Sequence, residues 1–306
     1  MKDQIGPFEI YVDDNLIDKI HKNKLVTINT INNYEANSCF ILRSSNDLQK
    51  TALARLTEPN TLRKVNLRRN YSMSGIKPRD AKQYFFSELL VDQDQLMCVG
   101  LGPAGTGKTT LAIAHSLEQV FSKEKTLHLC KPTALVGKLK NTFGPVPGSI
   151  DDKYAPHVQH FSSVIEGVLG KKSAGYINLL FEKGDIRFTP VEYSRGMTFK
   201  DCIFILDEVQ NLTWHELKTV CSRMGENSKL ILLGDPDQID RRFSLQESGI
   251  YNMLTSKAFK SSPFTSSIYL TEQYRGPIAT LIADIDYEKR EQQQRSNSNS
   301  DTRLTV

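Results

Sequence analysis

The 306-residue sequence has no apolar run that approaches the roughly 18 residues of a membrane-spanning helix, so we expect no transmembrane segment. Its opening, MKDQIGPFEIYVDD, is polar and acidic instead of basic and then apolar, so we expect no signal peptide and a cytoplasmic protein. The five cysteines are scattered without a CxxC pair, which favours reduced thiols over a disulfide framework. No two histidines four positions apart enclose a carboxylate, which argues against a dedicated zinc site.

Net charge is also small, because Lys and Arg exceed Asp and Glu by only four, and this does not require a polyanionic partner. The distribution is uneven. The window Lys50–Lys82 holds nine basic and two acidic residues, a net charge of +7, and the rest of the chain carries −3. A concentrated basic segment can follow a phosphate backbone, and it can equally form a solvated face. Charge alone leaves both interpretations open.

The first 75 residues are predicted to form a small β-rich accessory module. Their apolar runs have strand length and are separated by Asn and Asp clusters, which favour turns. One segment, Asp14–Lys22, has helical spacing instead, and no catalytic cluster is visible in residues 1–75. The predicted strands are Phe8–Val12, Leu25–Ile28, Ser38–Arg43 and Thr51–Arg55.

From residue 76 to residue 287, buried strands alternate with amphipathic helices. This pattern is typical of an α/β fold whose parallel sheet is covered on both faces. Residues 288–306 contain almost no core-forming side chains, so we expect a disordered polar tail. The predicted strands are Leu96–Leu101, Thr126–Cys130, Cys202–Asp207, Lys229–Gly234 and Ser267–Leu270, and the predicted helices are Lys108–Phe121 and Thr213–Met224.

The strongest motif is GPAGTGKT at residues 102–109, which matches G-x-x-x-x-G-K-[ST] between a predicted strand and a predicted helix. Its inner glycines let backbone amides turn round an anion, and the helix N-terminus adds partial positive charge. We expect Lys108 to reach the β- and γ-phosphates of ATP and the Thr109 hydroxyl to bind Mg²⁺. The predicted nucleotide-binding residues of this P-loop are Gly102, Pro103, Ala104, Gly105, Thr106, Gly107, Lys108, Thr109 and Thr110.

A second motif, IFILDEVQ at residues 203–210, ends a buried strand in two acids. Carboxylates are costly there unless they face a cation or water. Asp207 therefore suits the Mg²⁺ site, and Glu208 is placed to orient and deprotonate an attacking water. The alternative is that the acids cap a following helix.

Two further motifs also follow predicted strands. LLGDPDQID at residues 232–240 places Gln238 at a carboxyl strand end, where ligands of open α/β sheets bind, and Gln238 is predicted to sense the γ-phosphate. A plain Pro–Asp turn is the alternative. LTEQYRGP at residues 270–277 places Arg275 before a Gly-Pro break, where it can act as an arginine finger on the transferring phosphate. An ordinary surface arginine is the alternative.

These motifs, together with VEYSRGMTF at residues 191–199 and KPTALVGK at residues 131–138, resemble those of the PhoH-like ATPases, a group related to superfamily-1 helicases. The resemblance covers about residues 76–287 and implies a RecA-like P-loop NTPase core. Through IKPRDAKQ at residues 76–83 it implies that Gln83 recognises the adenine base. It also supports Arg275 as the arginine that contacts the γ-phosphate.

Residues 8–67 resemble the linker that joins a PIN ribonuclease domain to the ATPase in two-domain PhoH relatives. The few residues before this segment cannot hold a PIN domain and no four-acid cluster appears, so we expect no nuclease activity. Two positions depart from the family pattern. Met197 stands where a second basic residue is often found, and Lys138 stands where an acidic residue is usual.

The leading hypothesis is a Mg²⁺-dependent ATPase that couples hydrolysis to nucleic-acid binding or remodelling, with RNA favoured over DNA and helicase activity as a further possibility. One α/β core cannot close on its nucleotide from both sides, so we expect a homo-oligomer in which a neighbour supplies Arg275 or Arg195. The family resemblance suggests a hexameric ring. Two alternatives remain open: a P-loop kinase, which would exclude water, and a nucleotide-gated RNA-binding module with little catalysis.

Overall fold

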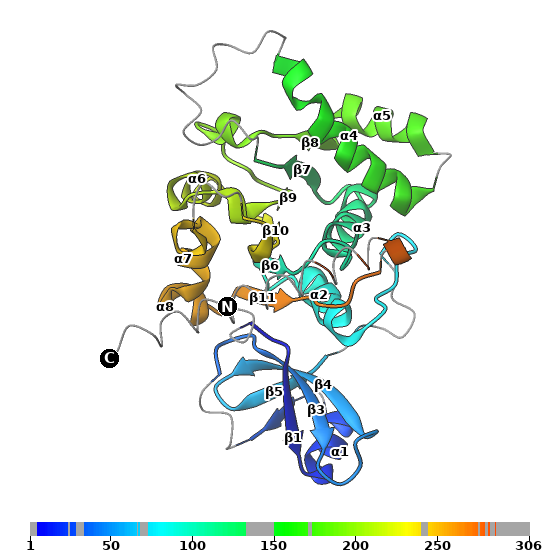
Figure 1. Ribbon diagram of the computed structural model, residues 1–306, viewed down its shortest axis with the longest axis vertical. Helices are drawn as coiled ribbons and strands as arrows, with labels where there is room; N and C mark the ends of the chain where they lie inside the picture. The colour runs from blue at the N-terminus through cyan, green and yellow to red at the C-terminus, as the bar shows by residue number, and fades with distance from the viewer. Residues whose placement is uncertain are drawn as a thin grey trace.

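A computed structural model describes residues 5–23, 25–28, 34–65, 67, 73–132, 150–170, 173–239, 244–274, 276–278, 281 and 285, with the backbone alone at 150–156. The predicted tail at residues 288–306 lies outside these ranges, as does Lys138. Two separate sheets are present, one in the N-terminal part and one in the α/β core (Figure 1).

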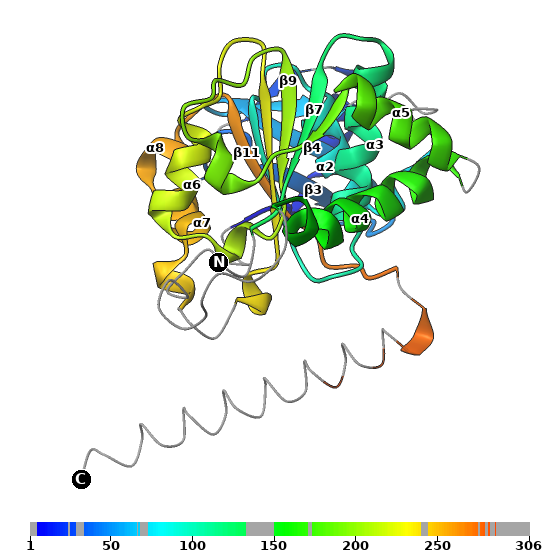
Figure 2. The same cartoon turned by 90° about the horizontal axis from the view of Figure 1, so that it is seen from above.

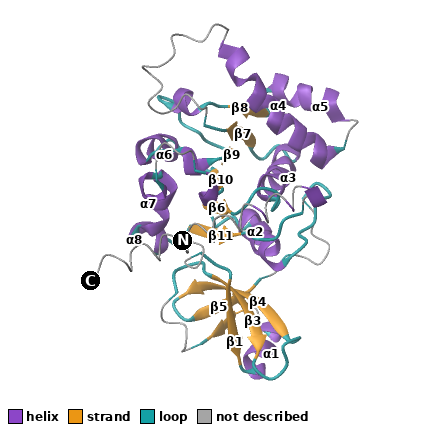
Figure 3. Ribbon diagram, viewed as in Figure 1, coloured by secondary structure: helices purple, strands orange, loops and turns teal. Residues whose placement is uncertain are grey.

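The N-terminal sheet has the order β1-β3-β4-β5-β2 among the described residues. Its strands dominate this end of the molecule, whereas helices surround the other sheet (Figure 3). The helix α1 packs on it through Ile17 and Ile20, which are both fully buried. The elements are β1 (Phe8–Val12), α1 (Asp14–Lys22), β2 (Leu25–Thr27), β3 (Cys39–Ser44), β4 (Thr51–Glu58) and β5 (Thr61–Lys64).

The core sheet is parallel throughout its described strands, in the order β11-β6-β10-β9-β7-β8. This confirms the predicted α/β fold with a parallel sheet. The strands are β6 (Met97–Leu101), β7 (Thr126–Cys130), β8 (Ile186–Phe188), β9 (Cys202–Leu206), β10 (Lys229–Gly234) and β11 (Thr265–Tyr269). The helices are α2 (Ala81–Val91), α3 (Lys108–Phe121), α4 (Ile150–Leu169), α5 (Ala174–Lys183), α6 (Trp214–Cys221), α7 (Gly249–Thr255) and α8 (Lys257–Lys260).

Helices cover both faces of this sheet, α2 to α5 on one side and α6 to α8 on the other (Figure 2). Successive side chains of β9 point to opposite faces of the sheet. Ile203 and Ile205 belong to the core beneath α2, α3 and α4, and Phe204 and Leu206 belong to the core beneath α6 and α7. The strand is a continuous apolar run in the sequence because both of its faces are buried.

Two strands were missed by the sequence pattern, and both are short: β5 lies inside the N-terminal sheet between β4 and β2, and β8 lies at an edge of the core sheet beside β7. β5 has one buried side chain, Leu62, and β8 has three residues. So few apolar positions cannot establish a period of two.

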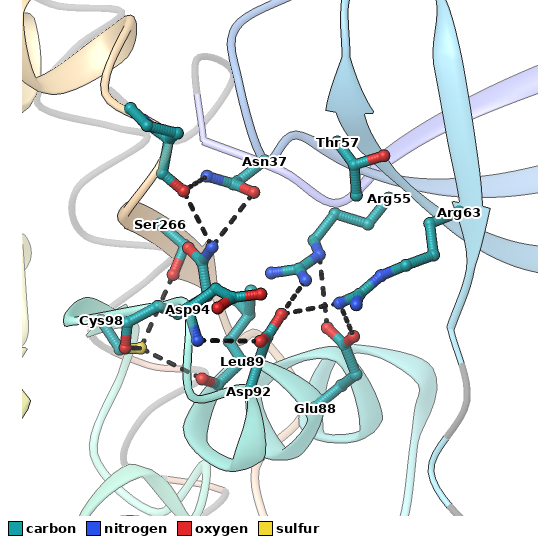
Figure 4. Close-up of polar contacts among 12 residues, drawn as sticks. Asn37, Arg55, Thr57, Arg63, Glu88, Leu89, Asp92, Asp94, Cys98 and Ser266 are labelled. Atoms are coloured by element: carbon teal, nitrogen blue, oxygen red, sulfur yellow. Dashed lines mark hydrogen bonds and ion pairs between the residues drawn. The ribbon is translucent and has the colours of Figure 1, made fainter. Parts of the chain in front are cut away.

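Charged side chains join the two sheets at the C-terminal end of α2 (Figure 4). Arg55 of β4 and Arg63 of β5 both bond the carboxylate of Asp92, and Arg63 Nη2 also lies 2.7 Å from Glu88 Oε1. Burial raises the pKa of Glu88 to about 7, against the lowering effect of Arg63. Lys229 Nζ closes the same helix end by donating to the backbone carbonyls of residues 89, 90 and 92.

The basic window Lys50–Lys82 is therefore not one phosphate-binding surface. Arg55 is 1% exposed and faces the interior. Lys50 pairs with Asp18 inside the N-terminal part. Arg68 and Arg69 lie outside the described residues. The nine basic residues of the window therefore do not form one continuous surface, either for binding phosphates or for contact with solvent.

Three compositional expectations concern membranes, thiols and metals. No helix in the described ranges has the length and apolar character that a bilayer span requires. The five cysteines are all free thiols, and four of them are buried. Within the same ranges, no group of three or more His, Cys, Asp and Glu side chains is placed to hold a metal ion.

Candidate nucleotide-binding site

Three neighbouring strands of the core sheet end at one cavity of about 250 Å³. β6 leads into the P-loop, β10 into the Asp235–Gln238 turn, and β9 into the two acids. Because the strands are parallel, motifs that are far apart in the sequence meet at the carboxyl edge of the sheet. Of the predicted site residues, the cavity is lined by Ala104, Gly105, Gly107, Lys108, Thr109, Thr110, Asp207, Glu208 and Gln238.

The P-loop begins at a position that requires glycine. Gly102 has a φ of 141°, and a Cβ atom there would lie 2.1 Å from the carbonyl oxygen of Leu270. Gly105 and Gly107 also have positive φ values, 86° and 85°. The chain can therefore make the tight turn that the motif predicts before α3 starts.

Replacing Gly102 by Ala should destabilise the fold, since the methyl group meets a backbone carbonyl and the left-handed conformation is strained. We expect a loss of about 1–3 kcal/mol in the free energy of unfolding, measured by urea titration. Gly167→Ala is the matched control, because a Cβ atom there meets nothing within 4 Å and the site lies inside α4. That variant should gain roughly 0.5–1 kcal/mol. Equal effects at the two sites would contradict the assignment of Gly102 to a strained turn.

Lys108 begins α3 with its ammonium group turned back onto the loop. Nζ donates to the carbonyl oxygens of Gly102 at 2.5 Å and of Pro103 at 2.8 Å. The residue is 8% exposed and lines the cavity. The ammonium group thus lies at the cavity wall, where the motif predicts that it meets phosphate.

Asp207 is the buried acid of the site, 5% exposed at the end of β9. Its Oδ2 accepts from Thr109 Oγ1 at 3.1 Å and its Oδ1 from the backbone amide of Glu208 at 2.9 Å. Burial raises the pKa of Asp207, the Glu208 carboxylate raises it further, and Lys131 and Lys108 oppose the rise. A hydroxyl and a carboxylate side by side, with the charged form disfavoured by burial, fit a hard divalent cation such as Mg²⁺.

Glu208 follows in a left-handed conformation with a φ of 58°, which is rare outside glycine and asparagine. The predicted alternative of a cap is partly met, because Glu208 precedes the short 3₁₀ helix η5 (Val209–Asn211), but its side chain makes no capping bond. The carboxylate instead contacts Lys131, with 3.4 Å from Nζ to Oε1, and Gln210, whose Nε2 donates to Oε2 at 2.7 Å.

Gln238 lines the cavity from the turn after β10. Its Nε2 donates to Asp235 Oδ2 at 2.8 Å, and Asp235 Oδ1 accepts from the backbone amide of Asp237. Burial raises the pKa of Asp235. The Pro–Asp turn that was the alternative interpretation is therefore present, and it places Gln238 in the cavity wall.

The family model described as PhoH-like protein matches residues 75–285 of this chain. The chain belongs to the PhoH-like family. This confirms the resemblance drawn from the motifs. This chain is 30% identical over 287 residues to Protein PhoH2 of Bacillus subtilis, and the match covers 92% of this chain and 64% of that protein. It is also 30% identical over 238 residues to Protein PhoH2 of Thermobispora bispora, covering 77% of this chain and 52% of the relative.

The PhoH-like chain thus spans less than two thirds of the length of these two relatives. Among solved structures, it is similar to the Pif1 helicase from Candida albicans, with a TM-score of 0.31 and 15% identity over 64% of this chain and 40% of the helicase. A likeness at that TM-score carries no conclusion about activity.

Gln83, predicted to recognise adenine, lies beside the P-loop of this PhoH-like chain. Its Nε2 donates to the Thr106 carbonyl at 2.9 Å, and its Oε1 accepts from the Arg79 amide at 2.9 Å. Both ends of the amide group therefore already bond to the protein. Tyr274 lies next to this group, since its amide donates to the Gly105 carbonyl and its ring lies under the Arg79 guanidinium at 5.0 Å. Base recognition by Gln83 stays a prediction.

Several residues of this site were not predicted. His160 and Val164 line the cavity from α4, and Lys131 and Gln210 hold Glu208. Gln210 stands in the DEVQ motif and is fully buried, so an amide in a strand-end motif was a usable signal. The α4 residues had none, because helical spacing alone does not indicate which side chains reach a cavity.

Of the two arginines predicted to act on the nucleotide of a neighbouring subunit, the structure describes only Arg195. Arg275 lies outside the described residues. Arg195 is exposed after the 3₁₀ helix η4 (Val191–Ser194) and is not among the residues that line the cavity. Both roles stay predictions.

Proposed function

We propose that this chain binds Mg²⁺–ATP in the cavity and hydrolyses it. The observation that supports this most is the meeting of three groups on one cavity: the P-loop ammonium of Lys108, a buried acid bonded to the P-loop hydroxyl, and the second acid Glu208. These are the parts that phosphoryl transfer to water requires.

In the proposed reaction, Lys108 and the P-loop hold the β- and γ-phosphates. Glu208 accepts a proton from a water whose oxygen attacks the γ-phosphorus while the bond to the β,γ-bridging oxygen breaks, giving ADP and phosphate. Thr109 and Asp207 would hold Mg²⁺, which when bound neutralises charge on the phosphate oxygens. Gln238, which lines the cavity, would sense the γ-phosphate.

Coupling of this hydrolysis to nucleic acid, with RNA favoured over DNA, is part of the proposal. It is supported by membership of the family and not by the basic window, whose arginines at 55 and 63 bond Asp92. A hexameric ring with Arg275 or Arg195 acting in trans is the oligomer we propose, because the described cavity wall comes from one sheet edge and α4. If the chain is also a helicase, the energy of ATP hydrolysis would drive the unwinding of nucleic acid.

The function is tested by phosphate release from ATP, with and without single-stranded RNA or DNA, and by the mass of the assembly. We expect release in Mg²⁺ and none in EDTA, because the charge on the phosphates is then not neutralised. Lys108→Ala should lose both ATP binding and turnover. Labelled phosphate appearing on an acceptor instead of in solution would favour the kinase alternative, and tight ATP binding without release would favour the gated module.

A further inference from the structure

Both carboxylate oxygens of Glu208 are held by side chains outside the P-loop. Oε1 lies 3.4 Å from Lys131 Nζ, and Oε2 accepts from Gln210 Nε2 at 2.7 Å. Gln210 is itself fixed, since it is fully buried and its Oε1 accepts from the Asp235 amide at 3.1 Å. A carboxylate held in this way has a defined orientation before any water is bound.

Lys131 comes from a fourth strand end. It directly follows β7, which lies next to β9 in the sheet, so its side chain reaches the acid at the end of the neighbouring strand. Its side chain is 21% exposed and that of Glu208 is 33% exposed, so solvent anions have access to the pair. Lys131 is not among the residues that line the cavity, whereas Glu208 is.

We propose that Lys131 is a positioning residue that keeps Glu208 in a resting orientation, and that a phosphate of a bound nucleic-acid strand releases Glu208 by pairing with Lys131. This rests on the proposed hydrolysis of ATP and explains how nucleic acid would raise its rate. Gln210 and Lys131 bind the Glu208 carboxylate by different interactions, a neutral hydrogen bond and an ion pair. The neutral Gln210 bond survives the arrival of an anion, whereas the Lys131 ion pair is open to exchange with a competing phosphate.

The test compares Lys131→Met with the wild-type chain in phosphate release at saturating Mg²⁺–ATP, without and with the single-stranded RNA poly(U). Methionine keeps an unbranched chain of similar length without the charge. We expect the kcat without RNA to rise about two- to fivefold, the effect of losing a partly exposed ion pair. The KM for ATP should stay unchanged, and poly(U) should no longer stimulate.

Three controls make this decisive. Lys131→Arg keeps the charge and should behave as wild type. Lys200→Met removes a lysine whose ion pair with Glu226 is exposed, and it should change neither kcat nor stimulation. Lys131→Met combined with Glu208→Gln should show no turnover, since the gain passes through Glu208.

The outcomes separate this inference from the proposed function. A Lys131→Met variant with unchanged or lower kcat overturns the restraint, and a raised KM shows instead that Lys131 contacts ATP. A wild-type chain that hydrolyses ATP but ignores both poly(U) and single-stranded DNA rejects nucleic acid as the releasing anion. Absence of phosphate release in the wild-type chain rejects the hydrolase itself.

Discussion

Glu208→Gln should remove ATP turnover and leave ATP binding nearly intact. In the proposed reaction the amide could not accept the proton of the attacking water, whereas Lys108, Thr109 and Asp207 would still hold the phosphates and Mg²⁺. We expect kcat to fall about 10²- to 10⁴-fold, the usual contribution of a general base. Phosphate release gives kcat, and titration with a fluorescent ATP analogue gives the affinity.

The control for this prediction is Glu226→Gln, which makes the same chemical change in an exposed side chain that pairs with Lys200. It should retain full turnover. Equal turnover in Glu208→Gln and the wild-type chain would remove Glu208 from the reaction and return the gated module as the better account. A joint loss of binding and turnover would mean that Glu208 holds the nucleotide instead of acting on water.

The sequence was sufficient to predict that some of these residues lie together, because the strands of a parallel sheet end at one edge. Asp207, Glu208 and Gln238 were chosen from the residues that follow apolar runs, and the structure places all three on the cavity of the P-loop. Their order along the chain did not matter, since β6, β10 and β9 are neighbours in the sheet. Each choice used only local pattern and the geometry common to open α/β folds.

Residues whose importance depends on a contact with another element were missed. Lys131 is an ordinary lysine after a strand until β7 and β9 are known to be adjacent. The sequence pattern identified Lys229 only as the first residue of a strand. In the structure its ammonium group donates hydrogen bonds to backbone carbonyls at the C-terminal end of α2. The basic window Lys50–Lys82 could not be interpreted from its charge, because composition cannot tell an arginine that faces solvent from Arg55, which pairs with an acid of another element.

The second prediction concerns the ion pairs between the two sheets, which we expect to contribute strongly to the stability of the fold. Asp92 bonds both Arg55 and Arg63, and without it the only acid left beside the guanidinium of Arg55, among the residues that the structure describes, is Glu88, with 3.5 Å from Nε to Oε2. Arginine does not lose its proton in proteins, so it cannot relieve this by neutralising itself. A charge that stays buried and poorly paired costs far more than the pair itself contributes.

Asp92→Ala should therefore lower the free energy of unfolding by about 3–5 kcal/mol, measured by urea titration. Glu9→Gln breaks the exposed pair with Arg43 and should cost only about 0–1 kcal/mol. The double variant Asp92→Ala with Arg55→Met separates a stranded charge from a damaged helix end, since methionine fills the space without the charge. It should be more stable than Asp92→Ala alone. If the second change brings no recovery, the loss belongs to the end of α2 and not to Arg55.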